Sequence, residues 1–273
     1  MNDKTIKKLL SRNSNTHKGK SGHILVIAGS YDYVGAAILS SVSALRIGSD
    51  LVTLACPEKV GLTANIYCPD LITLKLYGKN LDESHYNTII KDINKYDTIL
   101  IGNGIGKKPS TKKLIIKLLK NKKFQSKNKV IDANAIKFVK IQDLSNTILT
   151  PHQNEFKTLM KNSNIQNKLQ LKKSIGNNVI LLKEKNDKII TKSKDYINKT
   201  GNPGMAKAGT GDVLAGLCAG ILGKTNNLVE SSKASAYISG KIGDILLKKK
   251  KGYFYIASDM LDEINRINKL FTK

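Results

Sequence analysis

The 273-residue chain has few cysteines and no tryptophan, and its 21 acidic residues are fewer than half of its 46 basic ones. Cys56, Cys68 and Cys218 show no C-x-x-C spacing, and an odd number of cysteines cannot all pair within one chain. We therefore expect reduced thiols and a cytoplasmic protein. The four histidines have no ligand spacing with one another or with the cysteines, which argues against structural zinc.

Long apolar runs and linker-like segments are also absent from the sequence. No stretch reaches the roughly 20 apolar residues of a membrane-spanning helix, so we expect no membrane contact. The basic residues 1–20 contain neither an apolar core nor a small-residue cleavage site, unlike a secretory signal. Since no proline- or serine-rich linker divides the chain, we expect one domain over residues 1–273, with residues 1–17 as a short N-terminal helix or arm.

The formal net charge of +25 makes a basic nucleic-acid-binding protein one alternative function. Lysines are spread over the whole chain together with many asparagines and isoleucines, a composition typical of A/T-rich codons. The densest run, residues 248–251, is typical of a solvated helix end. Because no aromatic platform for bases accompanies the lysines, nucleic acid is the less favoured partner. The same positive field would attract an anionic small-molecule substrate.

Short apolar runs alternate with stretches whose apolar residues recur at helical spacing, which predicts an α/β protein with a mostly parallel central sheet. A charged turn after residue 183 predicts a hairpin whose second strand starts near Lys188. From residue 204 onward the chain is expected to be mainly helical, with one helix starting near Gly211 and others around 228–248 and 259–270. The expected strands cover residues 23–28, 51–56, 97–102, 129–134, 147–151 and 178–183.

The most informative stretch is TGNPGMAKAGTGDVLAGLCAGIL at residues 200–222. Its second half is too apolar for a surface helix, so it predicts a buried one. The helix would open with Gly209, Thr210, Gly211 and Asp212, whose amides could bind a phosphate closely. Asp212 could then remove the proton of a hydroxyl group that attacks this phosphate. Alternatively, Asp212 only complements the helix dipole, a role worth about 0.3–1 kcal/mol.

The string GNPGMAKAGTGDVLAG resembles the signature of the ADP/ATP-dependent NAD(P)H-hydrate dehydratases, a branch of the ribokinase-like superfamily. Four further blocks resemble the same family in the same order, so the likeness runs from about residue 18 to the C-terminus. It implies a ribokinase-like three-layer α/β/α fold. The four blocks are residues 22–58, IGNGIG at 101–106, VIDANAI at 130–136 and LTPHQNEF at 149–156.

The resemblance implies a carbon–oxygen lyase that repairs the S epimer of hydrated NADH or NADPH (NADHX and NADPHX). The ring hydroxyl is phosphorylated by ADP or ATP, and phosphate then leaves. Asp212 would be the base. The compact chain favours ADP over ATP as phosphoryl donor. Mg²⁺ would accompany the nucleotide, and no protein residue is predicted as its ligand. The resemblance also implies a homo-oligomer, commonly a tetramer, and a separate NAD(P)HX epimerase as functional partner.

Site residues follow from the same resemblance. Asp132 and Asn134 would lie near the phosphates and any Mg²⁺. On sequence alone, Ala36 could equally be a packing residue, and a lone histidine such as His152 is more often structural. The substrate residues would be Ala36, Gly104, Gly106, His152 and Asp212; the nucleotide residues would be Lys183, Glu184, Lys185, Asn186, Asp187, Gly209, Thr210 and Gly211.

The chain departs from the family pattern at three positions. Gln153 and Asn154 replace the proline and glycine of T-P-H-P-G-E-F, and Glu184 stands where a glycine follows the nucleotide-binding strand. Within the same superfamily, a hydroxyethylthiazole or hydroxymethylpyrimidine kinase is the closest alternative, because it would share the glycine-rich turn and the aspartate but release a stable phosphoester.

Overall fold

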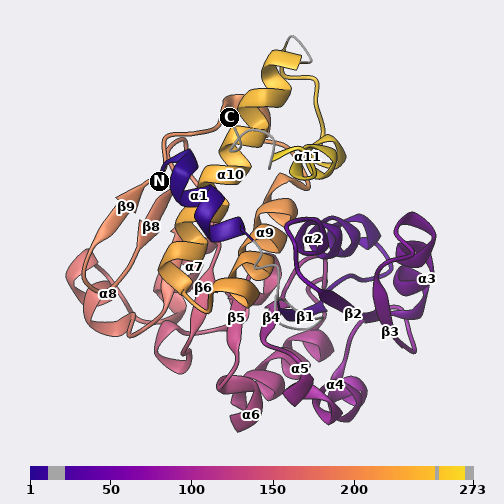
Figure 1. Ribbon diagram of the computed structural model, residues 1–273. Coiled ribbons are helices and arrows are strands. Elements are labelled where there is room, and N and C mark those ends of the chain that lie inside the picture. Colours follow the sequence, from indigo (N-terminus) through magenta and orange to yellow (C-terminus); the bar gives the residue numbers. More distant parts are fainter. Residues whose placement is uncertain (12–21, 250–251, 268–273) are drawn as a thin grey trace.

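The computed structural model describes residues 1–11, 22–249 and 252–267, which form a three-layer α/β/α arrangement (Figure 1). The central sheet has nine strands in the order β3-β2-β1-β4-β5-β6-β7-β8-β9. Strands β1 to β7 pair in parallel, whereas β8 and β9 pair antiparallel to their neighbours. The strands are β1 (His23–Ile27), β2 (Leu51–Pro57), β3 (Ile72–Leu76), β4 (Thr98–Ile101), β5 (Asn128–Ile131), β6 (Thr147–Leu149), β7 (Val179–Leu182), β8 (Lys188–Ile190) and β9 (Asp195–Ile197).

Both faces of the sheet are buried, as parallel sheets require. Along β1, Ile24 and Val26 point into one apolar core while Leu25 and Ile27 point into the other. The first core is covered by α1 (Asp3–Leu10), α2 (Val34–Arg46), α3 (Glu58–Tyr67), α9 (Thr210–Thr225), α10 (Leu228–Lys249) and α11 (Ala257–Ile264). The second is covered by α4 (Tyr86–Lys91), α5 (Pro109–Lys120), α6 (Lys122–Gln125), α7 (Gln153–Asn162) and α8 (Lys168–Ser174).

The predicted strands and the hairpin are confirmed, including the start of β8 at Lys188. The helix predicted near Gly211 is α9, which begins one residue earlier. Lys248 and Lys249 end α10 and are exposed, as expected for a helix end; residues 250–251 and the predicted helical residues 268–270 lie outside the described part of the chain. Within that part, no helix is long and apolar enough to cross a membrane.

Helices α2 and α9 pack with their backbones almost in contact. A Cβ atom added at Gly216 would lie 2.2 Å from the Ser40 carbonyl oxygen, and one at Gly220 would lie 2.8 Å from that of Ala44. The Ser43 hydroxyl also donates a 2.7 Å hydrogen bond to the Val213 carbonyl oxygen. The alanine and glycine content of α9 therefore serves close helix packing.

Candidate active site

The candidate site lies at the carboxyl edge of the sheet, where β1 and β4 are neighbours and the strand order changes direction. Such a switch point is the usual ligand site of open α/β sheets. The loops after β1 and β4 are joined there, because the Gly29 amide donates to the Asn103 carbonyl (2.8 Å) and the Ser30 hydroxyl donates to that of Gly104 (2.7 Å).

Three of the predicted substrate residues lie on these loops or in the first turn of α2, which follows the β1 loop. Gly104 has φ 66°, and a Cβ atom there would lie 2.9 Å from the Ala36 side chain and 2.7 Å from the Tyr33 carbonyl oxygen. Gly106, with φ 76°, lies beside Asn80. Glycine is therefore required by both backbone conformation and close approach at Gly104.

Helix α9 presents its N-terminus to the same edge. Its N-cap residue, Gly209, has φ 91°, and the Thr210 hydroxyl is turned back toward the Met205 and Lys207 carbonyl oxygens. The Thr210 amide donates to Lys207 at 3.4 Å, whereas the amides of Gly211 and Asp212 have no acceptor among the described residues. These two amides are free to bind an anion.

Asp212 belongs to a network of two carboxylates held by one amide. Asn103 Nδ2 donates to Asp212 Oδ1 (2.7 Å) and to Asp132 Oδ2 (2.8 Å). Asp132 Oδ1 accepts from the Thr150 hydroxyl (2.7 Å) and from Lys183 Nζ (3.0 Å). Asn103 Oδ1 is buried and has no hydrogen-bond partner in the described structure.

These contacts give the two sides of the network different proton affinities. Burial, and then the charge of Asp132, raises the pKa of Asp212 to about 7, against the opposing Asn103 hydrogen bond and Lys183 charge. Burial disfavours the Lys183 ammonium group, but Asp132, Glu155 and Asp212 together raise its pKa. At neutral pH the site thus holds a fixed cation beside a carboxylate that can take up a proton.

The lysine lies directly beside the free amides. A Cβ atom added at Gly211 would be 3.4 Å from Lys183 Nζ. The absence of a side chain at Gly211 means that nothing at this position blocks a phosphate from approaching both the ammonium group and the helix N-terminus.

His152 has a structural role in addition to its predicted contact with substrate. It is the N-cap of α7, where its Nδ1 accepts hydrogen bonds from the amides of Asn154 (3.1 Å) and Glu155 (3.4 Å). The carboxylate of the buried Glu155 in turn accepts a hydrogen bond from the His152 amide (3.1 Å). With Nδ1 acting as acceptor, Nε2 is the nitrogen that can donate, and it lies 3.4 Å from Glu155 Oε1. A donor role toward a ligand stays a prediction.

Sequence comparison identifies the family. A model of the NAD(P)H-hydrate dehydratase family matches residues 24–266. The chain belongs to this family. It is 38% identical, over 97% of its length, to the bifunctional NAD(P)H-hydrate repair enzyme Nnr of Methanocaldococcus jannaschii, of which it covers 52%. It thus spans about half the length of the bifunctional relatives that it matches.

A relative of similar length also matches. The chain is 35% identical to the ADP-dependent (S)-NAD(P)H-hydrate dehydratase of Nitrosopumilus maritimus, with 98% of this chain and 96% of the relative covered. 

Solved structures confirm the ribokinase-like fold. The ADP/ATP-dependent NAD(P)H-hydrate dehydratase of Bacillus subtilis, co-crystallised with ATP and Mg²⁺, superimposes with a TM-score of 0.83 at 23% identity, covering 99% of this chain and 97% of that one. A ribokinase-like superfamily protein from Enterococcus faecalis gives 0.81 at 25% identity, covering 97% and 94%.

Two departures from the dehydratase pattern contact each other. The Gln153 side-chain amide donates a hydrogen bond to Glu184, and Glu184 pairs with Lys188 (2.7 Å). Glu184 is not among the residues with positive φ, so its backbone does not require the glycine that the family pattern has there. Asp187 closes the same turn, because its carboxylate accepts from the Glu184 amide (3.4 Å) and from Asn198 (3.2 Å).

The acidic residues near the site do not form a metal cage typical of Mg²⁺. Within the described residues, no group of three or more His, Cys, Asp or Glu side chains has metal-binding geometry. Both Asp132 oxygens already accept hydrogen bonds, and Asn134 Oδ1 accepts from Lys137 (3.0 Å) instead of joining Asp132. A divalent cation would therefore depend on nucleotide phosphates and water for most of its ligands.

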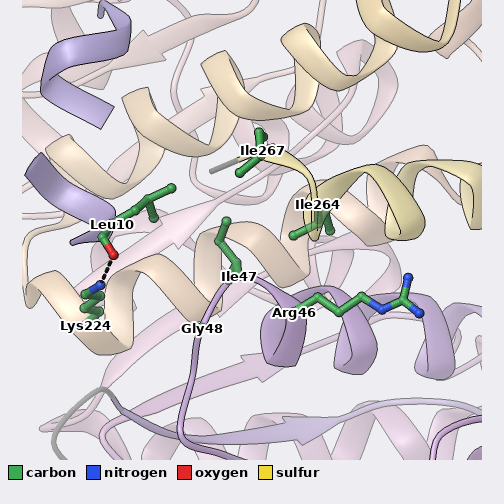
Figure 2. Close-up of a pocket in the computed structure, with 7 residues that line it drawn as sticks. All are labelled: Leu10, Arg46, Ile47, Gly48, Lys224, Ile264 and Ile267. Atoms are coloured by element: carbon green, nitrogen blue, oxygen red, sulfur yellow. Dashed lines mark hydrogen bonds between the residues drawn. The ribbon is translucent and has the colours of Figure 1, made fainter. Parts of the chain in front are cut away.

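A hollow of about 170 Å³ lies at the opposite end of α9. The Lys224 ammonium group donates a 2.6 Å hydrogen bond to the Leu10 carbonyl oxygen there, and Figure 2 shows this bond among the lining residues. From Asp212 to Lys224 the helix rises about 18 Å, so this hollow is separate from the carboxyl edge. Its lining lacks a carboxylate, a hydroxyl or a thiol: Leu10, Arg46, Ile47, Gly48, Lys224, Ile264 and Ile267.

Sequence reasoning missed Asn103 and Thr150 as site residues. Asn103 lies between two glycines directly after a buried strand, a position that marks a polar side chain held at the sheet edge. Thr150 follows β6 in the same way. The hydrogen bonds from Asn103 and Thr150 to Asp132 could not be predicted from the spacing of these residues in the sequence.

Proposed function

We propose that the chain is a single dehydratase domain that converts the S epimer of hydrated NADH or NADPH back to NADH or NADPH, using ADP as phosphoryl donor. The family match and the name of the Nitrosopumilus relative support this substrate class. The observation that carries the proposal is the pairing of Asp212, with its pKa near 7, and two unbound amides at the start of α9. A base and an anion site in contact are what hydroxyl phosphorylation needs.

In this reaction Asp212 takes the proton of the ring hydroxyl while the hydroxyl oxygen attacks the terminal phosphorus of ADP. The bond between that phosphorus and the bridging oxygen breaks, and AMP leaves with the oxygen. The Gly211 and Asp212 amides, together with Lys183, stabilise the charge on the transferred group. Inorganic phosphate then leaves with the ring C–O electron pair, and loss of a neighbouring ring proton forms the double bond.

The predicted ligand residues divide into two groups along the sheet edge. Ala36, Gly104 and Gly106 serve the hydrated ring from the β1 and β4 side, with Asn103 holding Asp212 between the groups. His152, also predicted for the ring, lies on the other side of Asp212, where its backbone pairs with that of Lys183. Mg²⁺ supplies charge neutralisation when it arrives with the nucleotide. The hairpin turn and the start of α9 serve the nucleotide: Lys183, Glu184, Lys185, Asn186, Asp187, Gly209, Thr210 and Gly211.

The surroundings of the reaction are also proposals. The free cysteines fit a reducing, cytoplasmic setting. We propose a homotetramer in solution and an NAD(P)HX epimerase as the functional partner, in keeping with the bifunctional name of the Methanocaldococcus relative.

A repair assay tests the function. We expect the protein, supplied with ADP and Mg²⁺, to restore the absorbance of reduced nicotinamide from hydrated NADH or NADPH with release of AMP and phosphate. ATP in place of ADP tests donor choice. A hydroxyethylthiazole or hydroxymethylpyrimidine phosphate formed by the same protein, with no recovery of absorbance from either donor, would contradict the proposal.

A further inference from the structure

Two lysines and a tyrosine form a cationic cluster at the end of the site away from the nucleotide. Lys59 Nζ lies 4.2 Å from the centre of the Tyr31 ring, and Lys79 Nζ lies 5.2 Å from it. The Tyr31 amide also donates to the Lys79 carbonyl oxygen (2.8 Å), which ties the two loops together. All three side chains are exposed.

The cluster lies on the same sheet edge as Asp212. Tyr31 follows β1, Lys59 follows β2 in the first turn of α3, and Lys79 follows β3. Asn80, next to Lys79, lies beside Gly106, and Tyr33, two residues after Tyr31, touches Gly104. The cluster therefore continues directly from the loops that surround the proposed ring site.

Neither ammonium group is neutralised within the part of the chain that the structure describes. No described carboxylate lies within 4.0 Å of Lys59 or Lys79, although Lys183 at the other end of the edge is paired with Asp132. Asp32 and Glu58 are sequence neighbours of the cluster, but neither forms a described ion pair with it. The tyrosine ring holds the two cations together without cancelling their charge.

The hydrated dinucleotide must continue away from Asp212 beyond its reacting ring. The side toward β5, β6 and β7 is occupied by the Lys183–Asp132 pair and the proposed nucleotide turn. On the opposite side, the sheet edge runs from β4 to β3 and ends at the lysine cluster. This distance is three strand spacings, or about 14 Å. The rest of the dinucleotide carries phosphate groups, and paired lysines are common ligands for phosphate.

We propose that Tyr31, Lys59 and Lys79 form the subsite for a phosphate of the adenosine half of the substrate, and so contribute to choosing and orienting the hydrated dinucleotide. This inference rests on the proposed function. The phosphate is either the diphosphate bridge, shared by NADHX and NADPHX, or the 2′-phosphate of NADPHX alone.

The test compares Lys59→Ala, Lys79→Ala and the double variant with Lys117→Ala. Lys117 is an exposed lysine on α5, away from the site, and its Nζ lies 4.5 Å from the centre of the Tyr86 ring on α4, so it is a matched control. We expect the double variant to raise the KM for the hydrate about 10-fold, with kcat and the KM for ADP changed less than twofold, and the control to match wild type. Equal losses for both hydrates identify the diphosphate bridge, whereas a loss confined to NADPHX identifies the 2′-phosphate.

An unchanged KM for both hydrates, or an equal rise in the KM for ADP, would overturn the inference. Binding of NADPH, followed by its own fluorescence, keeps the test independent of turnover. If the wild-type protein repairs no hydrate, the proposed function fails, but the same variants still reveal whether the cluster binds a phosphate of a dinucleotide. Weaker binding of NADPH by the double variant, with a smaller dependence on salt than in wild type, supports the subsite. Unaltered NADPH binding refutes it.

Discussion

Asn103 Nδ2 donates a 2.7 Å hydrogen bond to Asp212 Oδ1 and holds the carboxylate at the N-terminus of α9. This bond works against burial and the charge of Asp132, which raise the pKa of Asp212. Asn103 thus controls how readily the proposed base exchanges a proton. It also fixes where that base points.

Replacing Asn103 with alanine removes the contact that favours the charged form of Asp212. We expect the pH midpoint of kcat/KM to move upward, and kcat to fall about 10-fold because the carboxylate loses its orientation. A pH–rate profile of the variant measures both effects. A midpoint that stays in place or moves downward would contradict this role.

Asp212→Asn keeps the size of the side chain but removes the base. We expect kcat to fall by about 10²–10⁴-fold with the KM for ADP little changed. Steady-state repair kinetics, with circular dichroism to verify folding, measure this. Turnover near that of wild type would refute the general-base role.

The raised pKa of Asp212 also makes a stability prediction. Between its ordinary value of 3.8 and about 7, the folded state holds a proton that the unfolded chain has lost, so the free energy of unfolding falls as pH rises through this window. Above pH 7 the full cost of the buried charge remains. We expect Asp212→Asn to be more stable than wild type by about 1–3 kcal/mol at pH 8, with little difference at pH 4. Denaturant unfolding at both pH values tests this; equal stability at pH 8 would show that the carboxylate is well solvated.

Two glycines of α9 are expected to respond differently to a methyl group. Gly211→Ala places Cβ 3.4 Å from Lys183 Nζ, an ordinary contact that narrows the phosphate site, so the KM for ADP rises while the melting temperature stays near that of wild type. Gly216→Ala places Cβ 2.2 Å from the Ser40 carbonyl oxygen and is expected to cost about 2–3 kcal/mol of stability. Thermal melts and ADP kinetics on both variants separate the two effects. The reverse pattern would be inconsistent with the packing described.

The contact between Gln153 and Glu184 can be measured by a double-mutant cycle. If these two departures support each other in shaping the nucleotide turn, Gln153→Ala and Glu184→Ala each raise the KM for ADP, and the double variant is no worse than the poorer single one. The coupling expected for such a neighbour pair is about 0.5–1 kcal/mol. Fully additive effects would mean that the two positions act separately.

The sequence predicted the elements whose periodicity is strong. The apolar residues of β1, β4 and β7 are all buried, and α9 is apolar on all sides, so their patterns are unambiguous. Helix α3 and strand β3 were not predicted. Strand β3 is an edge strand with two exposed positions. Helix α3 contains a glycine, Gly61, at a position where a Cβ atom would lie 2.9 Å from the Lys75 side chain. Tertiary contacts, not local propensity, maintain these two elements.

The candidate site was predictable only in part for a similar reason. Asp212 and its glycines form one continuous string, which the sequence displays directly. The bond from Asn103 to Asp212 joins residues 109 positions apart, and that from Lys183 to Asp132 joins residues 51 apart. Such pairings arise from the strand order of the sheet, which the sequence predicted only as mostly parallel.

The backbone contact between α2 and α9 limits how the enzyme can open. With no side chain between Gly216 and Ser40, neither helix can tilt or slide without parting main-chain atoms that touch. Asp212 on one helix and Ala36 on the other, the proposed base and the proposed ring contact, are consequently expected to move as a single rigid unit. For the proposed reaction, we expect reactants to enter and leave past the flanking turns, while the spacing between the proposed base and the proposed ring contact stays constant from one turnover to the next.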